Sequence, residues 1–419
     1  MLRNFGLLVV GRAGGAVLGL AATALTARGL GAGDFGLLVL VHTYALLFQG
    51  LFNPHSYEAV VRFGVNSGDQ RQRRLLLAAF MRLDIAAALL GCVIAIGLVA
   101  AAKPLFGWSD QAAGWAIAFS SIVALSPVAT MTGVLRLHDR FDLLALQSGI
   151  RQMVRLAGVS AAFWWQAGPG WYLLAWYLGL LVEQLWLLGW GWRETHNRVG
   201  TLDLWRTRWA HLIAKFPGIQ RYTAAAYGQS LVDLGNKQVL TLLVGVVLGA
   251  EGAGLYRLAR EVAKTVAGQV IMLREAMLPE LARLWPQDQS RFLRLTTRTC
   301  ASAAATGAVL WLVVHFWADT AIIALVGQSY AAAAPLMSFL VAAAALDLTG
   351  SPLRPAIFAM GRPGAVFRIN ATAIGLHALL LPFLAGHFGL YGAGVAAICA
   401  AAVSVTGLGL ILKRQLAKV

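Results

Sequence analysis

The chain alternates long apolar stretches with short polar connections from one end to the other. Each stretch is long enough to cross a hydrocarbon core of about 30 Å as a helix, which takes about 20 residues. Backbone groups in lipid must be hydrogen-bonded within their own segment, so the stretches are expected to be helices. The pattern predicts an all-α polytopic membrane protein with about twelve transmembrane helices, at 5–27, 35–60, 75–102, 111–135, 142–165, 169–192, 222–248, 253–278, 295–318, 330–352, 364–385 and 391–412.

The composition of the chain agrees with this pattern. Hydrophobic residues make up 59% and charged residues 12% of the chain, and the mean hydropathy is +0.69. A soluble domain carries about 25% charged residues, so buried core helices of a soluble protein do not explain the sequence. The three cysteines fall within apolar stretches, and their spacing indicates neither a disulfide framework nor a metal site.

Basic residues gather on alternate connections between the predicted helices. One set of connections holds clusters at 71–74, 193–221 and 413–418, whereas the opposite set holds only Arg28 and Lys103. Cytoplasmic connections of membrane proteins carry an excess of Lys and Arg, so both termini are predicted to lie in the cytoplasm. Because this asymmetry accounts for most of the net charge of +16, the charge is no sign of nucleic-acid binding.

The longest polar connection, residues 193–221, divides the chain almost in half. Trp205, Trp209 and Leu212 fall on one helical face of this segment, so a linker helix lying on the inner leaflet is expected. The predicted organisation is an N-lobe at 1–192, this cytoplasmic interfacial linker, and a C-lobe at 222–419, with six helices in each lobe.

A short internal repeat supports two equivalent halves. Residues 30–37 (LGAGDFGL) follow the first predicted helix, and residues 248–255 (LGAEGAGL) follow the seventh. Glycine permits the tight reversal that an outer turn between two long helices requires. Because both halves begin in the cytoplasm, the repeat is expected to be parallel, with its pseudo-axis along the membrane normal.

Several motifs resemble those of a known family. Residues 26–36 (TARGLGAGDFG) resemble the first outer turn of the polysaccharide-transport family, the Wzx-type O-antigen flippases. Residues 61–64 (VRFG) and 135–141 (LRLHDRF) are similar to its inner-loop signatures, and 254–256 (GLY) fits the matching turn of the second half. Ala32 departs from the proline that is frequent in the family, and the chain lacks the two extra helices of the lipid II flippase branch.

The resemblance implies the fold of the multidrug/oligosaccharidyl-lipid/polysaccharide exporters, with two six-helix lobes around a central cavity. It implies a flippase, and not an enzyme, that moves an undecaprenyl-pyrophosphate-linked oligosaccharide across the bacterial inner membrane in O-antigen and lipopolysaccharide biosynthesis. The implied partners are this lipid-linked glycan and membrane lipids, with a polysaccharide polymerase complex as a further candidate. No cofactor is expected. Since the chain has no Walker-type loop, a gradient of H⁺ or Na⁺ is the candidate energy source.

Charged residues inside the predicted helices are the candidate binding residues, because a charge at a helix centre costs roughly 2.5–3.5 kcal/mol. Three cations share one face of the eighth helix with a single acid, Glu261. Two arginines share a face of the fifth helix, and one lies in the first. Arginine grips phosphate bidentately and stays charged. The predicted pyrophosphate- and sugar-binding residues are Arg257, Arg260, Lys264, Arg151, Arg155 and Arg12. Pairing with acids on neighbouring helices is the structural alternative.

Buried acids supply candidates for ion coupling. Asp347, Glu183 and Asp233 lie in predicted helices, where a carboxylate serves either as an ion site or as the partner of a cation. Asp233 and Lys237 stand one helical turn apart, so they can neutralise each other. The ion-coupling role and the paired role therefore both stay open.

Two other functions are weighed against the flippase. A multidrug exporter of the same superfamily would favour an acidic, aromatic cavity for cationic drugs, which is the opposite sign of charge. A membrane-embedded glycosyltransferase or ligase would need carboxylate-rich or large outer catalytic loops, whereas the outer connections here are short and poor in acids and histidines. The charge pattern favours the flippase.

Overall fold

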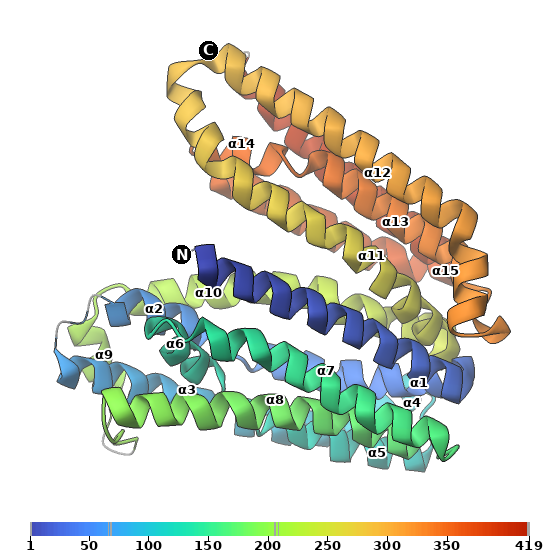
Figure 1. Cartoon of the computed structure of the whole chain (residues 1–419), viewed down its shortest axis with the longest axis horizontal. Helices are drawn as coiled ribbons and strands as arrows, with labels where there is room; N and C mark the ends of the chain where they lie inside the picture. The colour runs from blue at the N-terminus through green and yellow to red at the C-terminus, as the bar shows by residue number, and fades with distance from the viewer. Residues whose placement is uncertain (1, 66, 68, 205–206, 208, 417–419) are drawn as a thin grey trace. The chain divides into compact units, whose positions relative to one another are not determined.

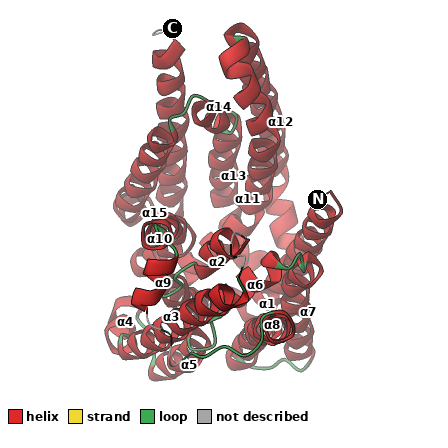
Figure 2. Cartoon of the chain, turned by 90° about the vertical axis from the view of Figure 1, so that its left-hand side faces the viewer, coloured by secondary structure: helices red, strands yellow, loops and turns green. Residues whose placement is uncertain are grey.

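The computed structural model is helical along the chain (Figures 1 and 2) and describes residues 2–65, 67, 69–204, 207 and 209–416. Within these ranges it contains no strand. Side chains are described for the same residues except 2–13, 236, 265–276, 279 and 415–416. Seven helical stretches of the described chain are long and apolar enough to cross a membrane, and three of them are 52, 46 and 52 residues long.

Three long helices each contain a glycine with a positive φ that divides them in two. These are α1 (Leu2–Leu51) at Gly31, α11 (Leu240–Gln287) at Gly249 and α15 (Pro363–Leu416) at Gly389, with φ of 74°, 73° and 58°. Glycine adopts this conformation at little cost because it has no Cβ. With these divisions, the described helices supply about twelve transmembrane segments, as the sequence predicts.

The first of two compact units comprises residues 1–30 and 37–238. After α1 its elements are α2 (Ser56–Val65), α3 (Gln70–Gly97), α4 (Val99–Phe106), α5 (Asp110–Ser120), η1 (Ser121–Val123), α6 (Ala129–Leu137), α7 (Phe141–Trp164), α8 (Pro169–Arg198), α9 (Trp209–Lys215), α10 (Ile219–Leu234) and the π-helix η2 (Gly235–Val239). This unit therefore includes the linker and the first part of the predicted seventh helix. The lobe boundaries drawn from the sequence remain a prediction.

The second unit comprises residues 31–36 and 239–419. Its elements are α11, α12 (Gln289–Leu325), η3 (Gln328–Tyr330), α13 (Ala333–Gly350), α14 (Leu353–Ala359) and α15. The helix α13 packs against α11, α12 and α15, which makes it the central element of this unit.

Prolines interrupt two of the predicted helices, 35–60 and 111–135, and a third predicted helix, 330–352, ends at one. Pro54 lies in the break between α1 and α2, Pro127 in the break before α6, and Pro352 in the break before α14. Proline has no N–H to donate and clashes with the preceding turn, which ends a helix. The last two prolines each follow a serine, Ser126 and Ser351, and stand at matching places in the two halves.

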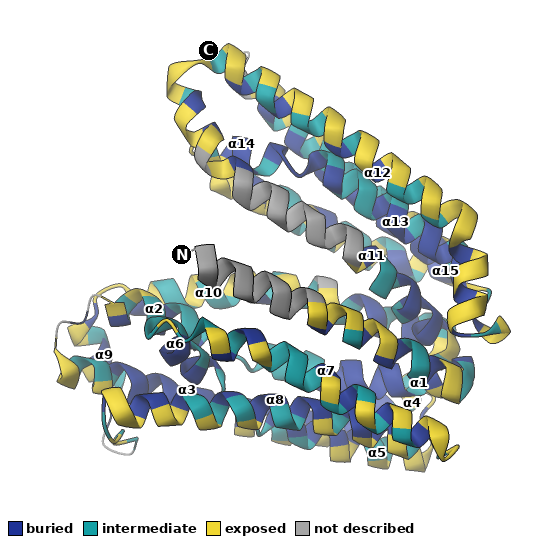
Figure 3. Cartoon of the chain, in the orientation of Figure 1, coloured by how far each residue is buried: buried dark blue, intermediate teal, exposed yellow. Residues whose placement is uncertain are grey.

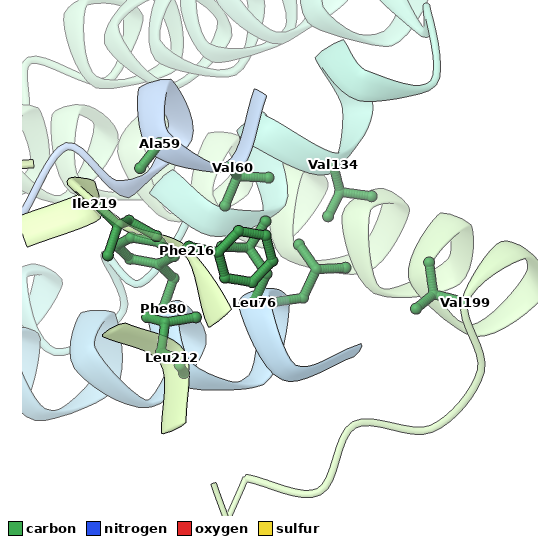
Figure 4. Packing of buried hydrophobic residues seen from close by; sticks show 11 residues of the cluster. Ala59, Val60, Leu76, Phe80, Val134, Val199, Leu212, Phe216 and Ile219 are labelled. Carbon is green, nitrogen blue, oxygen red and sulfur yellow. The ribbon is translucent and has the colours of Figure 1, made fainter. Parts of the chain in front are cut away.

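The apolar face of the linker packs against protein. Leu212 of α9 is fully buried in a cluster with Phe80, Phe216 and Ile219 (Figure 4). Trp209 meets the ring of Phe80 edge-on, with centroids 5.7 Å apart. Burial of each such side chain stabilises by about 1.5–3 kcal/mol. The expectation that Trp209 and Leu212 lie on the lipid surface is therefore wrong, because α3 offers them an apolar partner; Trp205 lies outside the described residues.

The two copies of the internal repeat pack against each other within the second unit. A Cβ added at Gly36 would lie 1.7 Å from the carbonyl oxygen of Ala250, and one added at Gly254 would lie 3.0 Å from the Cα of Gly36. These glycines hold the same position in LGAGDFGL and LGAEGAGL. Since neither site has room for a side chain, the matching glycines are explained by close backbone contact.

Candidate functional site

The cations predicted on the eighth helix come together on one face of α11. Arg257 Nη2 and Lys264 Nζ lie 2.7 Å and 2.9 Å from the same carboxylate oxygen, Oε1 of Glu261. The exposed fractions of their side chains are 13% for Arg257, 19% for Glu261 and 46% for Lys264. The helical spacing of these residues produces the arrangement directly. One carboxylate therefore bridges two cations.

The third cation of this face, Arg260, joins two helices of the second unit. Its Nη1 donates to the hydroxyl of Thr241 over 3.3 Å, and Thr241 is fully buried in the part of α11 that precedes Gly249. The ring of His377, on α15, lies within electrostatic range of Arg260. We call Arg257, Arg260, Glu261 and Lys264 the cationic face.

The cationic face lies well inside the helix. At a rise of 1.5 Å per residue, Arg257 and Lys264 stand about 12 Å and 22 Å along the helix from the turn at Gly249. Three cations share this face with one carboxylate, which is paired with two of them, so the face itself carries more positive than negative charge. A charge at such a depth is costly unless it meets water, a partner or a ligand, and an anionic ligand would relieve this imbalance.

Arg151 of the first unit forms an ion pair. Its Nη1 lies 3.0 Å from Oε2 of Glu183 on α8, and Gln147 donates to the other carboxylate oxygen over 3.4 Å. Glu183 is 10% exposed and Arg151 is 35% exposed. The structure thus brings together a predicted phosphate ligand and a predicted ion-coupling acid, which the sequence placed on separate helices without assigning them to each other.

Arg155, one turn along α7, is held within the packing of the first unit. Its Nη2 donates to the hydroxyl of Thr23 over 2.8 Å, and its guanidinium carbon lies 3.4 Å from the ring centroid of Trp176. The indole N–H of Trp176 in turn donates to Thr26 over 3.1 Å. A desolvated cation–π contact contributes up to about 2 kcal/mol. Only 8% of Arg155 is exposed, so these contacts tie α1, α7 and α8 together.

The remaining candidates are placed in different surroundings. Asp347 Oδ1 lies 3.7 Å from Nη2 of Arg354, and the same nitrogen donates to Ser404 over 3.4 Å. Asp233 is exposed on α10. Arg12 lies in α1, and its side chain is outside the described residues. The binding and coupling roles of all these residues stay predictions.

Sequence reasoning placed Asp84 inside a predicted helix but gave no role to this carboxylate of α3, which is 2% exposed. The Ser56 hydroxyl donates to Oδ1, while the backbone N–H and hydroxyl of Thr130 donate to Oδ2 over 2.8 Å and 2.7 Å. Ser56 is the first residue of α2 and Thr130 the second residue of α6, which follow the breaks at Pro54 and Pro127, and the first N–H groups of a helix lack partners within it. In the sequence, a hydroxyl residue follows each of these two prolines within three positions, and this pattern was the available signal for the two helix starts.

The comparisons with known proteins agree with this architecture. Residues 1–285 match the family described as "Polysaccharide biosynthesis protein". "Inner membrane protein YghQ" of Escherichia coli (strain K12) is 26% identical over 285 residues, which cover 66% of this chain and 79% of that protein.

Solved structures share the fold at low sequence identity. The structure described as "Lipid II flippase MurJ, inward closed conformation" matches with a TM-score of 0.76 and 12% identity, over 97% of this chain and 87% of that one. An inward-facing multidrug resistance MATE transporter of the MOP superfamily matches with a TM-score of 0.69 and 14% identity, over 95% of both chains. A mutant of the Vibrio cholerae MATE transporter VcmN matches at 0.59 and 13%, over 99% of this chain and 96% of that one. The chain is thus a multi-pass membrane protein that belongs to the polysaccharide biosynthesis protein family and has the fold of the MOP-superfamily flippases and transporters.

Proposed function

We propose that the protein is a flippase for an undecaprenyl-pyrophosphate-linked oligosaccharide, which it moves from the inner to the outer leaflet of the bacterial inner membrane by alternating access. Both termini are cytoplasmic in this proposal, and the glycan serves O-antigen or lipopolysaccharide assembly, with a polysaccharide polymerase complex as a candidate partner. The observation that carries the proposal is the cationic face, where Arg257, Arg260 and Lys264 share one face of a membrane helix with a single acid, Glu261. The family and the flippase fold support it.

The chemistry of the cationic face suits a pyrophosphate. Glu261 holds Arg257 and Lys264 on one oxygen, so it keeps the two cations in place while no ligand is bound. An incoming phosphate offers further charged acceptors, and the guanidinium fork of arginine binds them with charge-assisted hydrogen bonds. The polyprenyl tail remains in lipid, because burial of apolar chains away from water is favourable. Arg151, Arg155 and Arg12 are further proposed contacts of the cargo in the first unit.

Substitution of the cationic face tests the proposal. In a strain whose own gene is deleted, we expect Arg260→Ala and Lys264→Ala to reduce glycan export sharply at unchanged membrane abundance. Arg260→Lys should be intermediate because lysine keeps the charge without the fork, and Arg260→Glu should be the most severe. Arg298→Ala is the matched control, since Arg298 is exposed on α12. Normal export by the variant that carries alanine at 257, 260 and 264 would exclude this face from transport.

Multidrug export is the second candidate function, and the likeness to MATE structures favours it. A cation exporter needs acids in its binding region, whereas the cationic face has three cations and one acid. Drug susceptibility of the deletion strain separates the candidates. Increased susceptibility with intact glycan export would favour the exporter.

Coupling to H⁺ or Na⁺ is proposed through one of three acids. Glu183 and Asp347 are each within 4 Å of an arginine, and Asp233 lies within electrostatic range of His55. Export measured after collapse of the proton or the sodium gradient identifies the ion. The asparagine or glutamine variant that loses this dependence identifies the acid.

A further inference from the structure

The inner half of α8 carries an open groove that the proposed function does not use. Exposed and half-exposed residues recur along this helix (Figure 3). The groove has a volume of about 430 Å³ and is lined by Val182, Leu185, Trp186, Gly189, Trp190 and Arg193. These positions are separated by three or four residues or are adjacent, so they form one stripe on the helix. The stripe is apolar except at its last residue.

Exposed tryptophans indicate how α8 sits in the membrane. Trp171 near its first turn is 63% exposed, and Trp192 near its last turns is 46% exposed. The helix rises roughly 30 Å between them, which is the thickness of the hydrocarbon core, and tryptophan gathers at both membrane interfaces. From Val182 to Arg193 the rise is roughly 16 Å. The groove therefore spans one leaflet, with Arg193 at headgroup level, and the orientation from the basic connections makes it the inner leaflet.

The floor and the polar end of the groove are fixed by local contacts. The Trp186 indole donates to the carbonyl of Leu143 over 3.2 Å, and the rings of Trp186 and Trp190 are tilted with centroids 5.5 Å apart. The guanidinium carbon of Arg193 lies 5.1 Å from the centroid of Trp190. The apolar groove thus ends in a cation that contacts an aromatic ring.

Arg193 keeps its charge available for a ligand. Within the part of the chain that the structure describes, no carboxylate lies within ion-pair distance of Arg193. The neighbouring acid, Glu194, is already paired with Arg140 and lies 3.2 Å from Nε of Arg198. A guanidinium at headgroup level without an acid beside it is a site for a phosphate.

We propose that this groove binds one anionic phospholipid of the inner leaflet, with an acyl chain along 182–190 and the phosphate on Arg193. The apolar stripe has the length of one leaflet and suits an acyl chain, and the cation at its headgroup end suits the phosphate. The outer half of the same side continues with the exposed Leu174 and Leu178 and carries no further cation. A phosphate would find no second partner there, so the site holds a resident lipid and is not a path for cargo.

Lipid binding to the purified full chain tests the inference. Native mass spectrometry with phosphatidylglycerol and phosphatidylcholine of equal acyl chains should show several-fold more phosphatidylglycerol bound. Arg193→Gln should lower phosphatidylglycerol to the level of phosphatidylcholine. Gly189→Leu should lower both lipids, because a Cβ at Gly189 meets no atom within 4 Å and its side chain fills the groove without a clash. Arg71→Gln removes an exposed inner-end charge elsewhere and should change nothing.

Two outcomes would overturn the inference. One is unchanged phosphatidylglycerol binding by both Arg193→Gln and Gly189→Leu. The other is displacement of phosphatidylglycerol from wild type by far less undecaprenyl phosphate than competing phosphatidylglycerol, which would make the groove a docking site for cargo lipid. The flippase proposal is tested by glycan export and does not depend on either result.

Discussion

In both halves of the chain a Ser-Pro pair interrupts the corresponding helix, but the charged side chain near the interruption is an acid in the first unit and a cation in the second. In the first unit, Ser126 and Pro127 precede α6, and a buried carboxylate from α3 accepts hydrogen bonds from Thr130 at its start. In the second unit, Ser351 and Pro352 precede α14, and the residue after the break that makes polar contacts is a cation, Arg354. The two halves thus share the proline that ends the helix, whereas the polar side chains around the break differ.

The difference in burial assigns different roles to the two breaks. Asp84 is 2% exposed and accepts hydrogen bonds from two helix starts, so polar groups at both starts have a partner inside the protein. The side chain of Asp347 is 44% exposed and its Arg354 is 17% exposed, so the ion pair of the second unit reaches a more open environment. A break sealed by three hydrogen bonds is expected to be rigid, whereas a long ion pair at 3.7 Å constrains its helices less.

The largest expected effect comes from removal of the buried carboxylate. Asp84→Leu leaves two hydroxyls and one N–H without an acceptor, at about 1–3 kcal/mol for each buried group. We therefore expect a strong loss of thermal stability and of protein in the membrane, with Asp84→Asn less affected because its amide oxygen still accepts. Thermal unfolding followed by size-exclusion chromatography measures the difference. A melting temperature for Asp84→Leu equal to that of wild type would show that Asp84 does not secure the break.

The sequence predicts those features of the fold that depend on neighbours along the chain. Apolar runs predict the transmembrane segments, the glycine motifs mark two of the divisions, and the spacing of Arg257, Glu261 and Lys264 predicts their shared face, which the structure confirms as an ion-pair chain. Contacts between distant residues, such as Arg151 with Glu183, depend on how each helix is rotated about its axis. A membrane helix that is apolar all round carries little amphipathic pattern, so this rotation could not be inferred.

A smaller effect is expected at the contact between the two repeats. Gly36→Ala places a methyl group 1.7 Å from the carbonyl oxygen of Ala250, so backbone must move, and overpacking of this kind costs about 1–3 kcal/mol. Gly254→Ala meets atoms at 3.0 Å and should cost less. Gly33→Ala is the control, because its Cβ meets nothing within 4 Å. Equal melting temperatures for the alanine variants at 36 and 33 would contradict this close packing.

The smallest effect on stability is expected at the break of the second unit. Arg354→Gln removes an ion pair whose acid is nearly half exposed, and exposed pairs contribute about 0–1 kcal/mol. Glutamine is shorter than arginine, so the 3.4 Å hydrogen bond to Ser404 of α15 is lost together with the ion pair. The matched variant Asp347→Asn and the double variant complete a cycle that isolates the pair from the effects of each side chain. We expect a small coupling energy by thermal unfolding, well below the loss in Asp84→Leu. A loss in Arg354→Gln as large as that in Asp84→Leu would instead show that both halves depend equally on a charge at the break, and that the difference in burial does not set their rigidity.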